Sequence, residues 1–293
     1  MPDVDPFAPL DLESADGARA RVLPYGAQAV GWTPAPGAPG GAAERLYLSA
    51  RSAYRAGAAV RGGVPVIFPQ FADSGPYVRH GFARTRVWEV ERVGRDEKGA
   101  GVAVLTLGDD AETRALWPHA FRCTLTVRAA GAWLEVALAV ENPGAAPFAF
   151  TGALHTYLGV GDVEAARVCG LEGMAYRDKT HDKASGGVAR GPEGQPLAPA
   201  GEIDRVYATV ADTDGGGAIE VDDPALGRRT RVTQAGFADA VVWNPGGAVG
   251  EGLADVEPGG WRRFLCVEAG AVARPVAVAP GARWQGRQRF EGV

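Results

Sequence analysis

Short runs of alternating apolar and polar residues recur along this chain of 293 residues. In residues 121–128, FRCTLTVR, the side chains of Cys123, Leu125 and Val127 fall on one face of an extended segment, with arginines and threonines on the other. Residues 133–141, WLEVALAVE, repeat the pattern and end at the turn sequence ENPGAAP. Because successive side chains of a strand point to opposite faces, each run predicts a half-buried β-strand.

Turn-forming residues separate these runs and leave little room for helices. The chain holds 42 glycines and 21 prolines, and only residues 109–116, DDAETRAL, predict a short helix. No strand–helix–strand alternation and no repeat of fixed period is present. We therefore predict an all-β fold, a large sandwich of antiparallel strands, in one domain spanning residues 1–293. Ser185 to Gly201 is expected to be a long irregular loop inserted in this sheet system.

Composition narrows the class of partners. A net charge of −5 argues against nucleic acid, which needs a basic surface. No stretch approaches the roughly 20 apolar residues of a membrane span, and the acidic N-terminus lacks the features of a secretory signal. Cys123, Cys169 and Cys266 are odd in number, and their spacing fits no metal site; we expect buried, reduced thiols and no metal. These features predict a cytoplasmic protein, as a monomer or a weak homodimer.

An arginine-rich stretch is the first candidate for a binding site. Residues 61–84, RGGVPVIFPQFADSGPYVRHGFAR, hold Arg61, Arg79, His80 and Arg84 among glycines, prolines and aromatics, without lysine or glutamate. Guanidinium groups present a fixed fork of donors that suits phosphate or carboxylate oxygens. The stretch therefore predicts a pocket for an anionic, partly apolar ligand. The open alternative is a surface loop whose arginines pair with nearby acids.

A histidine and a glutamate are candidates for proton transfer. His155, in GALHTYLGVGD, is expected at the end of a strand beside the hydroxyl of Tyr157, where it could exchange a proton near neutral pH. Glu268, in RRFLCVEAG, shares an apolar face with Cys266 just before the strand is expected to end at Gly270. Desolvation there would raise its pKa and make it a better base. A histidine bonded to a backbone carbonyl and a glutamate that meets water are the alternatives.

Other polar residues give weaker signals. Asp204, in GEIDRVY, precedes a predicted strand and would either bind ligand hydroxyls or pair with Arg205. His119 and His181 are expected to be structural or solvated. Glycine-rich nucleotide loops and a GxSxG nucleophile elbow are missing. An acid–base pair with arginines and aromatic walls describes a site for a sugar phosphate.

Six segments carry a resemblance to a known family. The chain resembles the hexose-6-phosphate branch of the aldose 1-epimerase family through RGGVPVIFPQF, HGFART, LHTYLGVGDVEAARVCGLEGMAYRDK, EIDRVY, VVWNPG and LCVEAG, which run in family order from Arg61 to Gly270. The resemblance implies a galactose mutarotase-like β-supersandwich. It also implies an isomerase that interconverts the α and β anomers of a hexose 6-phosphate, with glucose 6-phosphate the expected substrate. No cofactor is expected, because ring opening and closure moves protons only.

The same resemblance assigns roles to individual residues. It makes His155 the catalytic acid and Glu268 the catalytic base. Arg61 and Arg84 would hold the 6-phosphate and the sugar, and Asp204 would bind sugar hydroxyls. The base takes the proton of the anomeric hydroxyl while the acid protonates the ring oxygen, and the ring recloses on the other face of the aldehyde.

Two positions depart from the branch pattern. Arg79 stands before HGFAR where glutamine is usual, so an additional cation would alter phosphate binding or sugar preference. Gly246 follows VVWNP where an aromatic residue is common, which predicts a more open wall. His80 is expected to be a further binding residue. A mutarotase for unphosphorylated aldoses and a non-catalytic carbohydrate-binding protein are the alternatives; the arginines count against the first, and the acid–base pair counts against the second.

Overall fold

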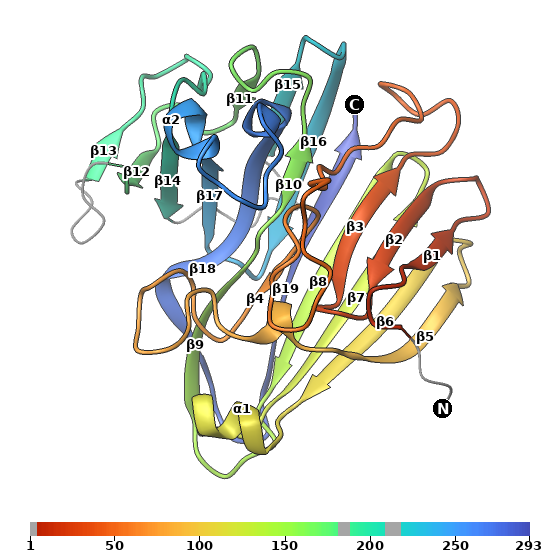
Figure 1. Ribbon diagram of the computed structural model, residues 1–293, viewed down its shortest axis with the longest axis vertical. Helices are drawn as coiled ribbons and strands as arrows, with labels where there is room; N and C mark the ends of the chain where they lie inside the picture. The colour runs from red at the N-terminus through yellow and green to blue at the C-terminus, as the bar shows by residue number, and fades with distance from the viewer. Residues whose placement is uncertain (1–4, 181–187, 209–217) are drawn as a thin grey trace.

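Antiparallel β-sheets make up most of the structure, a computed structural model that describes residues 5–180, 188–208 and 218–293 (Figure 1). Every pairing between the strands named below is antiparallel. Such pairing lets short connections join neighbouring strands, which fits the many glycine and proline turns. The all-β prediction is confirmed.

The strands form three sheets in the described residues. Sheet I has the order β1 (Leu10–Glu13), β2 (Arg19–Leu23), β3 (Gln28–Thr33). Sheet II has the order β13 (Val188–Arg190), β12 (Ala175–Asp178), β14 (Ile203–Ala208), β17 (Asp239–Asn244), β18 (Phe264–Val278), β9 (Phe148–Leu154), β4 (Val66–Ile67), and β10 (Tyr157–Gly159) also pairs with β18. Sheet III has the order β11 (Arg167–Cys169), β15 (Ile219–Asp223), β16 (Arg228–Ala235), β19 (Arg283–Gly292), β8 (Trp133–Glu141), β7 (Arg122–Ala130), β6 (Gly101–Gly108), β5 (Glu89–Arg95).

The predicted alternation is clearest in sheet III. Leu125 of β7 lies opposite Leu138 of β8, and Val127 lies opposite Val136; all four side chains are fully buried. The residues between them on β7 are partly exposed, so one face of this strand pair meets water. Burial of each such side chain stabilises the fold by about 1.5–3 kcal/mol.

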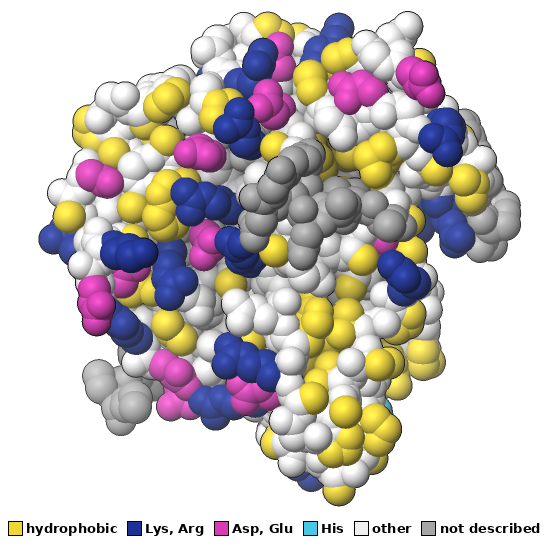
Figure 2. All heavy atoms as spheres, turned by 180° about the vertical axis from the view of Figure 1, so that it is seen from behind, with side chains coloured by type: hydrophobic (Ala, Val, Ile, Leu, Met, Phe, Trp, Pro, Cys, Tyr) yellow, Lys and Arg dark blue, Asp and Glu magenta, His cyan; other side chains and the backbone are white. Residues whose placement is uncertain are grey.

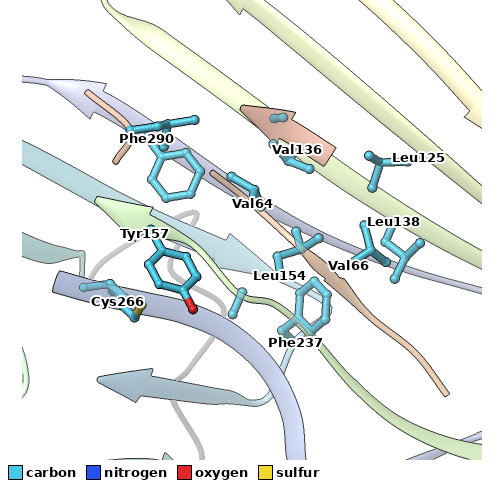
Figure 3. Packing of buried hydrophobic residues seen from close by; sticks show 14 of the residues in the cluster. Val64, Val66, Leu125, Val136, Leu138, Leu154, Tyr157, Phe237, Cys266 and Phe290 are labelled. Carbon is cyan, nitrogen blue, oxygen red and sulfur yellow. The ribbon is translucent and has the colours of Figure 1, made fainter. Parts of the chain in front are cut away.

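One continuous core joins the three sheets. Figure 3 shows Leu125, Val136 and Leu138 of sheet III in the same cluster as Leu154 and Cys266 of sheet II. Sheet I packs against β5, β6 and β7 (Figure 1). The sandwich therefore places sheet II on one side of the core and sheet III on the other.

Within the described residues, helical structure is limited to short segments, as expected. The predicted helix is present as α1 (Ala111–Leu116), whose Asp110 side chain accepts a hydrogen bond from the Thr113 backbone N–H. The Thr113 hydroxyl in turn accepts from the Asp110 backbone, which completes a capping box. The others are α2 (Gly246–Gly250) and the 3₁₀ segments η1 (Ala83–Thr85) and η2 (Gly260–Arg263).

The loop predicted from Ser185 to Gly201 is wrong in one part. Val188–Arg190 forms β13, an edge strand that pairs with β12. All three of its residues are exposed, so no apolar alternation marks it in the sequence. Residues 185–187 of this segment, and His181 before it, lie outside the described residues.

The strand end predicted at Gly270 is also wrong. β18 continues to Val278, with a register shift against β9 between Ala271 and Val276. The Asp239 carboxylate accepts hydrogen bonds from the backbone N–H groups of Val272 and Ala273, both at 2.7 Å. Gly270 therefore precedes a bulge rather than a terminus, a second position that glycine favours in strands.

The surface carries both signs of charge. Figure 2 shows acidic and basic side chains interspersed over the face seen from behind. Ion pairs occur in more than one sheet, as between Arg231 and Glu220 of sheet III and between Arg205 and Asp178 of sheet II. Among the described residues, no helix is long and apolar enough to cross a membrane. Of the three free cysteines, Cys123 and Cys266 are buried as predicted, but Cys169 is partly exposed.

Candidate active site

Neighbouring strands of sheet II align a row of polar and aromatic side chains. Tyr157 of β10 lies opposite Cys266 of β18, Cys266 lies opposite Trp243 of β17, and Trp243 lies opposite Asp204 of β14. Residues opposite one another in antiparallel strands share a face, so the four side chains form one row. Glu268 is two residues beyond Cys266 and faces the same way.

His155 reaches this face because the chain breaks between β9 and β10. Leu154 still pairs with Ala269, whereas the His155 backbone N–H donates to the Pro65 carbonyl at 3.0 Å. The His155 Nε2 lies 3.4 Å from Glu268 Oε1. The imidazole also stacks on the Tyr157 ring, with 5.0 Å between centroids and an interplanar angle of 10°. Two residues far apart in sequence therefore meet.

The break beside His155 is fixed from the other side of the core. The Thr156 hydroxyl donates to Gln288 Oε1 on β19 at 2.7 Å, and Gln288 Nε2 donates to the Val267 carbonyl on β18 at 3.0 Å. These groups are buried, so breaking either bond leaves an unsatisfied polar group in the core. The bridge holds the β9–β10 break in register with β18.

Burial controls the protonation of the pair. The side chain of His155 is 10% exposed and that of Glu268 is 1% exposed. The pKa of His155 is lowered to about 3, by burial first and then by the charges of Arg84 and Arg61. Burial raises the pKa of Glu268 well above its ordinary value, and nearby Asp204 adds to this effect. Burial therefore favours the uncharged form of each group, the protonated carboxyl and the neutral imidazole.

Each member of the pair also has an atom without a partner. His155 Nδ1 and Glu268 Oε2 are buried and make no hydrogen bond within the described residues. Buried polar atoms are usually paired, and an exception suggests a missing ligand or water. The two atoms can accept or donate to a molecule that enters the site.

His80 lies against the pair in a strained backbone conformation. Its φ is +65°, and its ring meets His155 edge-on with 5.5 Å between centroids. His80 Nδ1 accepts from the Ala72 backbone N–H at 3.3 Å. Burial first, and then the charges of His155 and Arg84, lower the pKa of His80 far below its ordinary value. A neutral imidazole that accepts at Nδ1 carries its proton on Nε2, which leaves a hydrogen-bond donor for a ligand.

The three arginines differ in how they are paired. Arg61 donates through Nε to Asp255 Oδ2 at 3.0 Å and through a terminal nitrogen to the Tyr157 hydroxyl at 2.8 Å. Arg79 pairs with Asp73 at 2.9 Å on the surface, with both side chains about two-thirds exposed at 65% and 67%.

Arg84 is the least engaged of the three. A terminal nitrogen donates to the Arg79 carbonyl at 3.3 Å, and its buried Nε has no partner within the described residues. The pKa of Arg84 is lowered to about 10, by burial first; Tyr157 opposes this shift, and the charges of Arg61 and Arg79 add to it. An anion would relieve this repulsion, so Arg84 is the guanidinium best placed to receive one.

Asp204 lies within β14 and not before it, contrary to the expectation from sequence. Arg205 pairs with Asp178 instead, at 3.4 Å. Burial raises the pKa of Asp204, while the charge of Lys179 opposes the shift. Lys179 Nζ lies 5.2 Å from the centre of the Phe71 ring. Among the described residues Asp204 forms no ion pair, and its role in binding a ligand stays a prediction.

Sequence reasoning missed several residues at this site. Trp243 meets His155 edge-on, with 5.9 Å between centroids, and forms an aromatic wall. Asp255 pairs with Arg61, but its sequence context, GLADVEPGG, gives no signal of that contact. Gly246 is buried at the start of α2 with a φ of +62°, and a Cβ there would lie 2.4 Å from the Glu202 nitrogen. A side chain at this position does not fit this backbone.

The fold also gathers groups that could hold a metal ion. His155, Cys266 and Glu268 place potential ligand atoms within 4.8 Å of one another. The linear spacing of the cysteines showed no such site, because the histidine arrives from a different strand. His119, by contrast, packs on Trp117 and Phe148 away from this group, as a structural residue.

Comparison with known proteins gives consistent results. A model of the aldose 1-epimerase family matches residues 10–291. A protein of Cenchrus ciliaris, named as a candidate glucose-6-phosphate 1-epimerase, is 31% identical over 290 residues, which cover 96% of this chain and 84% of the relative. An Escherichia coli K12 protein with the same name is 34% identical over 245 residues, 83% of this chain and 76% of the relative.

Solved structures agree on the fold. The crystal structure of a candidate mutarotase from Salmonella typhimurium matches with a TM-score of 0.84 and 26% identity, and the match covers 97% of this chain and 89% of that one. A galactose mutarotase related enzyme from Lactobacillus acidophilus matches with a TM-score of 0.75 at 14% identity, over 98% and 97% of the two chains. The predicted galactose mutarotase-like fold is confirmed.

Proposed function

This chain belongs to the aldose 1-epimerase family and is an isomerase of sugar anomers, and we propose that its substrate is a hexose 6-phosphate, glucose 6-phosphate first among them. The proposal rests on the contact between His155 Nε2 and Glu268 Oε1 at 3.4 Å, together with Arg84, whose buried Nε has no partner among the described residues. Ring opening needs a base and an acid within reach of one sugar ring, and anomer exchange needs nothing else.

His155 and Glu268 share the one proton that this reaction requires. The neutral pair of the empty site and the ion pair of carboxylate and imidazolium differ only in where that proton lies. A dianionic phosphate beside the site would favour the imidazolium form. Glu268 then takes the proton of the anomeric hydroxyl and His155 protonates the ring oxygen. Rotation about C1–C2 and the reverse transfers give the other anomer.

We propose that the three arginines have different roles in binding the substrate. Arg84 receives the 6-phosphate, because its buried Nε–H has no partner in the part of the chain that the structure describes. Arg61, which Asp255 and Tyr157 orient, is the second guanidinium that binds the phosphate. Asp204 and His80 bind sugar hydroxyls as acceptor and donor, and Arg79 adds positive charge from the rim.

A mutarotase for unphosphorylated aldoses is the second candidate. Asp255 and Asp73 neutralise Arg61 and Arg79 in the empty site, which reduces the positive charge available to a phosphate. Arg84 has no such counter-ion among the described residues, and this favours the phosphorylated substrate.

The test compares substrates in one assay. The rate of exchange between the α and β anomers is measured by NMR for glucose 6-phosphate, glucose and galactose, with and without protein. We expect kcat/KM for glucose 6-phosphate to exceed both others by at least about tenfold, since one charged hydrogen bond contributes about 1.5–3 kcal/mol. Equal values would support the free-aldose alternative, and no acceleration of any sugar would contradict both.

The whole chain is proposed to act as one domain. One core cluster includes Leu12 of sheet I, Leu125 of sheet III and Leu154 of sheet II. Proteolysis that separates a stable fragment retaining exchange activity would argue against a single unit.

A further inference from the structure

Three chemically different metal-ligating side chains converge beside the reaction pair. The imidazole of His155, the thiol of Cys266 and the carboxyl of Glu268 each offer one ligand atom, and these atoms lie within 4.8 Å of one another. Cys266 and Glu268 share a face of β18, and His155 enters from the β9–β10 break. The thiol is fully buried, and the proposed epimerase reaction does not use it.

The spacing is close to that of a tetrahedral metal site. Zinc binds nitrogen and oxygen ligands at about 2.0–2.1 Å and thiolate sulfur at about 2.3 Å, which places neighbouring ligand atoms roughly 3.3–3.7 Å apart. The distance of 3.4 Å between His155 Nε2 and Glu268 Oε1 already meets this condition. The sulfur needs to move by about 1 Å at most, which a turn of roughly 30° about the Cα–Cβ bond supplies without a change of rotamer.

The carboxyl of Glu268 has a second oxygen to offer at this position. Glu268 Oε2 is buried and has no partner in the described parts of the chain, so a cation held by His155 Nε2 has both carboxyl oxygens within reach. Three protein ligands with an open fourth position are typical of zinc sites that remain accessible to small molecules. A nitrogen, sulfur and oxygen set prefers a borderline-soft cation and is a poor set for magnesium.

We propose that His155, Cys266 and Glu268 form a binding site for a thiophilic divalent cation, Zn²⁺ or Cd²⁺, and that the bound cation blocks anomer exchange. The cation takes the lone pairs of His155 Nε2 and Glu268 Oε1, the two atoms between which the pair would share its proton. Cation and sugar phosphate therefore compete. The inhibition rests on the proposed function, whereas the binding does not.

The binding is tested with cadmium, because a cadmium–thiolate bond has an ultraviolet charge-transfer band. The starting protein carries Cys169→Ser, since that thiol is partly exposed and close to Glu172 and Glu220. We expect a band that saturates at one cadmium per chain. Zn²⁺ in excess removes it, and Mg²⁺ does not.

Two further substitutions identify the thiol. Cys266→Ser, which keeps the size of the side chain, should abolish the band. Cys123→Ser changes an equally buried thiol in sheet III and should leave the band intact. Circular dichroism and urea unfolding check that each variant is folded. A band that persists in Cys266→Ser, a band lost only in Cys123→Ser, or no band at all would overturn the site.

Inhibition is measured as the exchange rate of each variant relative to its own rate without metal. Even an outer-shell partner affects metal affinity by 10–100-fold, so loss of the thiol should raise the inhibitory Zn²⁺ concentration at least about tenfold. Saturating glucose 6-phosphate should reduce the cadmium band. Equal inhibition of the protein that keeps Cys266 and of the Cys266→Ser variant would contradict the proposal that a cation bound at this site blocks anomer exchange. A chain that shows the band but exchanges no anomers would refute the proposed function and leave the metal site standing.

Discussion

The β7–β8 pair of sheet III and the β10–β18–β17 group of sheet II differ in the kinds of side chain that they bury. On β7, buried and partly exposed residues alternate, and charged residues of the outer face pair across strands, as Arg128 does with Glu135. On β18, the first eight residues are all buried, and a glutamate is among them. The same strand geometry therefore gives a stable face in one region and a reactive one in the other.

The β10–β18–β17 group bears an energetic penalty that the β7–β8 pair avoids. Burying an uncompensated carboxyl or imidazole is unfavourable, and the pair Glu268 and His155 keeps its charge low for that reason. The β7–β8 pair buries only apolar side chains on its inner face. Substitutions in the two regions should consequently separate catalysis from stability.

The largest effect is expected from Glu268→Gln. Removing the proposed base should lower the exchange rate about 10²–10⁴-fold, while the fold remains. NMR exchange of glucose 6-phosphate anomers measures the rate. Glu135→Gln, the same chemical change in sheet III, is the matched control and should leave the rate unchanged. A Glu268→Gln protein with near-normal exchange would remove this residue from the mechanism.

Leu138→Ala should have the opposite profile. Truncating this fully buried side chain of β8 should lower the free energy of unfolding by about 2–5 kcal/mol, because it leaves a cavity in the core. The exchange rate per folded molecule should stay within about twofold. Urea unfolding and the NMR assay, both at low temperature, provide the two numbers. A rate that falls in parallel with stability would show that the regions are not separable.

The regular region was the easier one to predict. Cys123, Leu125 and Val127 alternate with polar residues, so the sequence alone indicates both the strand and its buried face. The end of β18 was missed, since Gly270 indicates a turn and a bulge equally well. β13 was missed because its three residues are all exposed.

The candidate site was predictable only in part, and for a physical reason. His155 and Glu268 stand out by their contexts, but their contact depends on the register of β9, β10 and β18, which no local pattern encodes. The partners Trp243 and Asp255 were missed for the same reason. Once side chains come from non-neighbouring strands, their meeting is a property of the sheet rather than of any segment.

Arg84→Ala should affect the phosphate and not the sugar. We expect KM for glucose 6-phosphate to rise about 10–100-fold, from the loss of a charged hydrogen bond worth about 1.5–3 kcal/mol. KM for glucose should change little. Steady-state kinetics on both sugars decide the matter, and Arg61→Ala in parallel tests the second arginine. Equal changes for the two substrates would remove the phosphate role.

The pH dependence of stability provides a smaller signal from the same glutamate. The pKa of Glu268 is raised in the folded protein, so its favourable contribution is complete below the ordinary value of 4.5 and is lost as the pH rises toward the folded value. Wild type should lose up to about 1.4 kcal/mol per pH unit from this group, and Glu268→Gln should not. Urea unfolding at about pH 5 and about pH 8 should show that the free energy of unfolding of the variant, relative to that of wild type, is higher at about pH 8 than at about pH 5. A constant difference would contradict the raised pKa.

The smallest effect is expected from Arg79→Gln, which restores the residue usual in the family branch. Arg79 pairs with Asp73 in an exposed position, and such pairs contribute about 0–1 kcal/mol. KM for glucose 6-phosphate should rise less than about threefold, and less still at high salt. A rise as large as that of Arg84→Ala would place Arg79 in direct contact with the phosphate.

We propose that His155 and Glu268 act as one unit on the anomeric centre of a hexose 6-phosphate. The most direct measurement is the NMR exchange rate of glucose 6-phosphate anomers for His155→Ala, Glu268→Gln and the double variant. Members of one catalytic unit have non-additive effects, so the double variant should be no more than about threefold slower than the slower single variant. The claim would be contradicted if the rate loss of the double variant equalled the product of the two single losses, or if the single variants had near-normal rates.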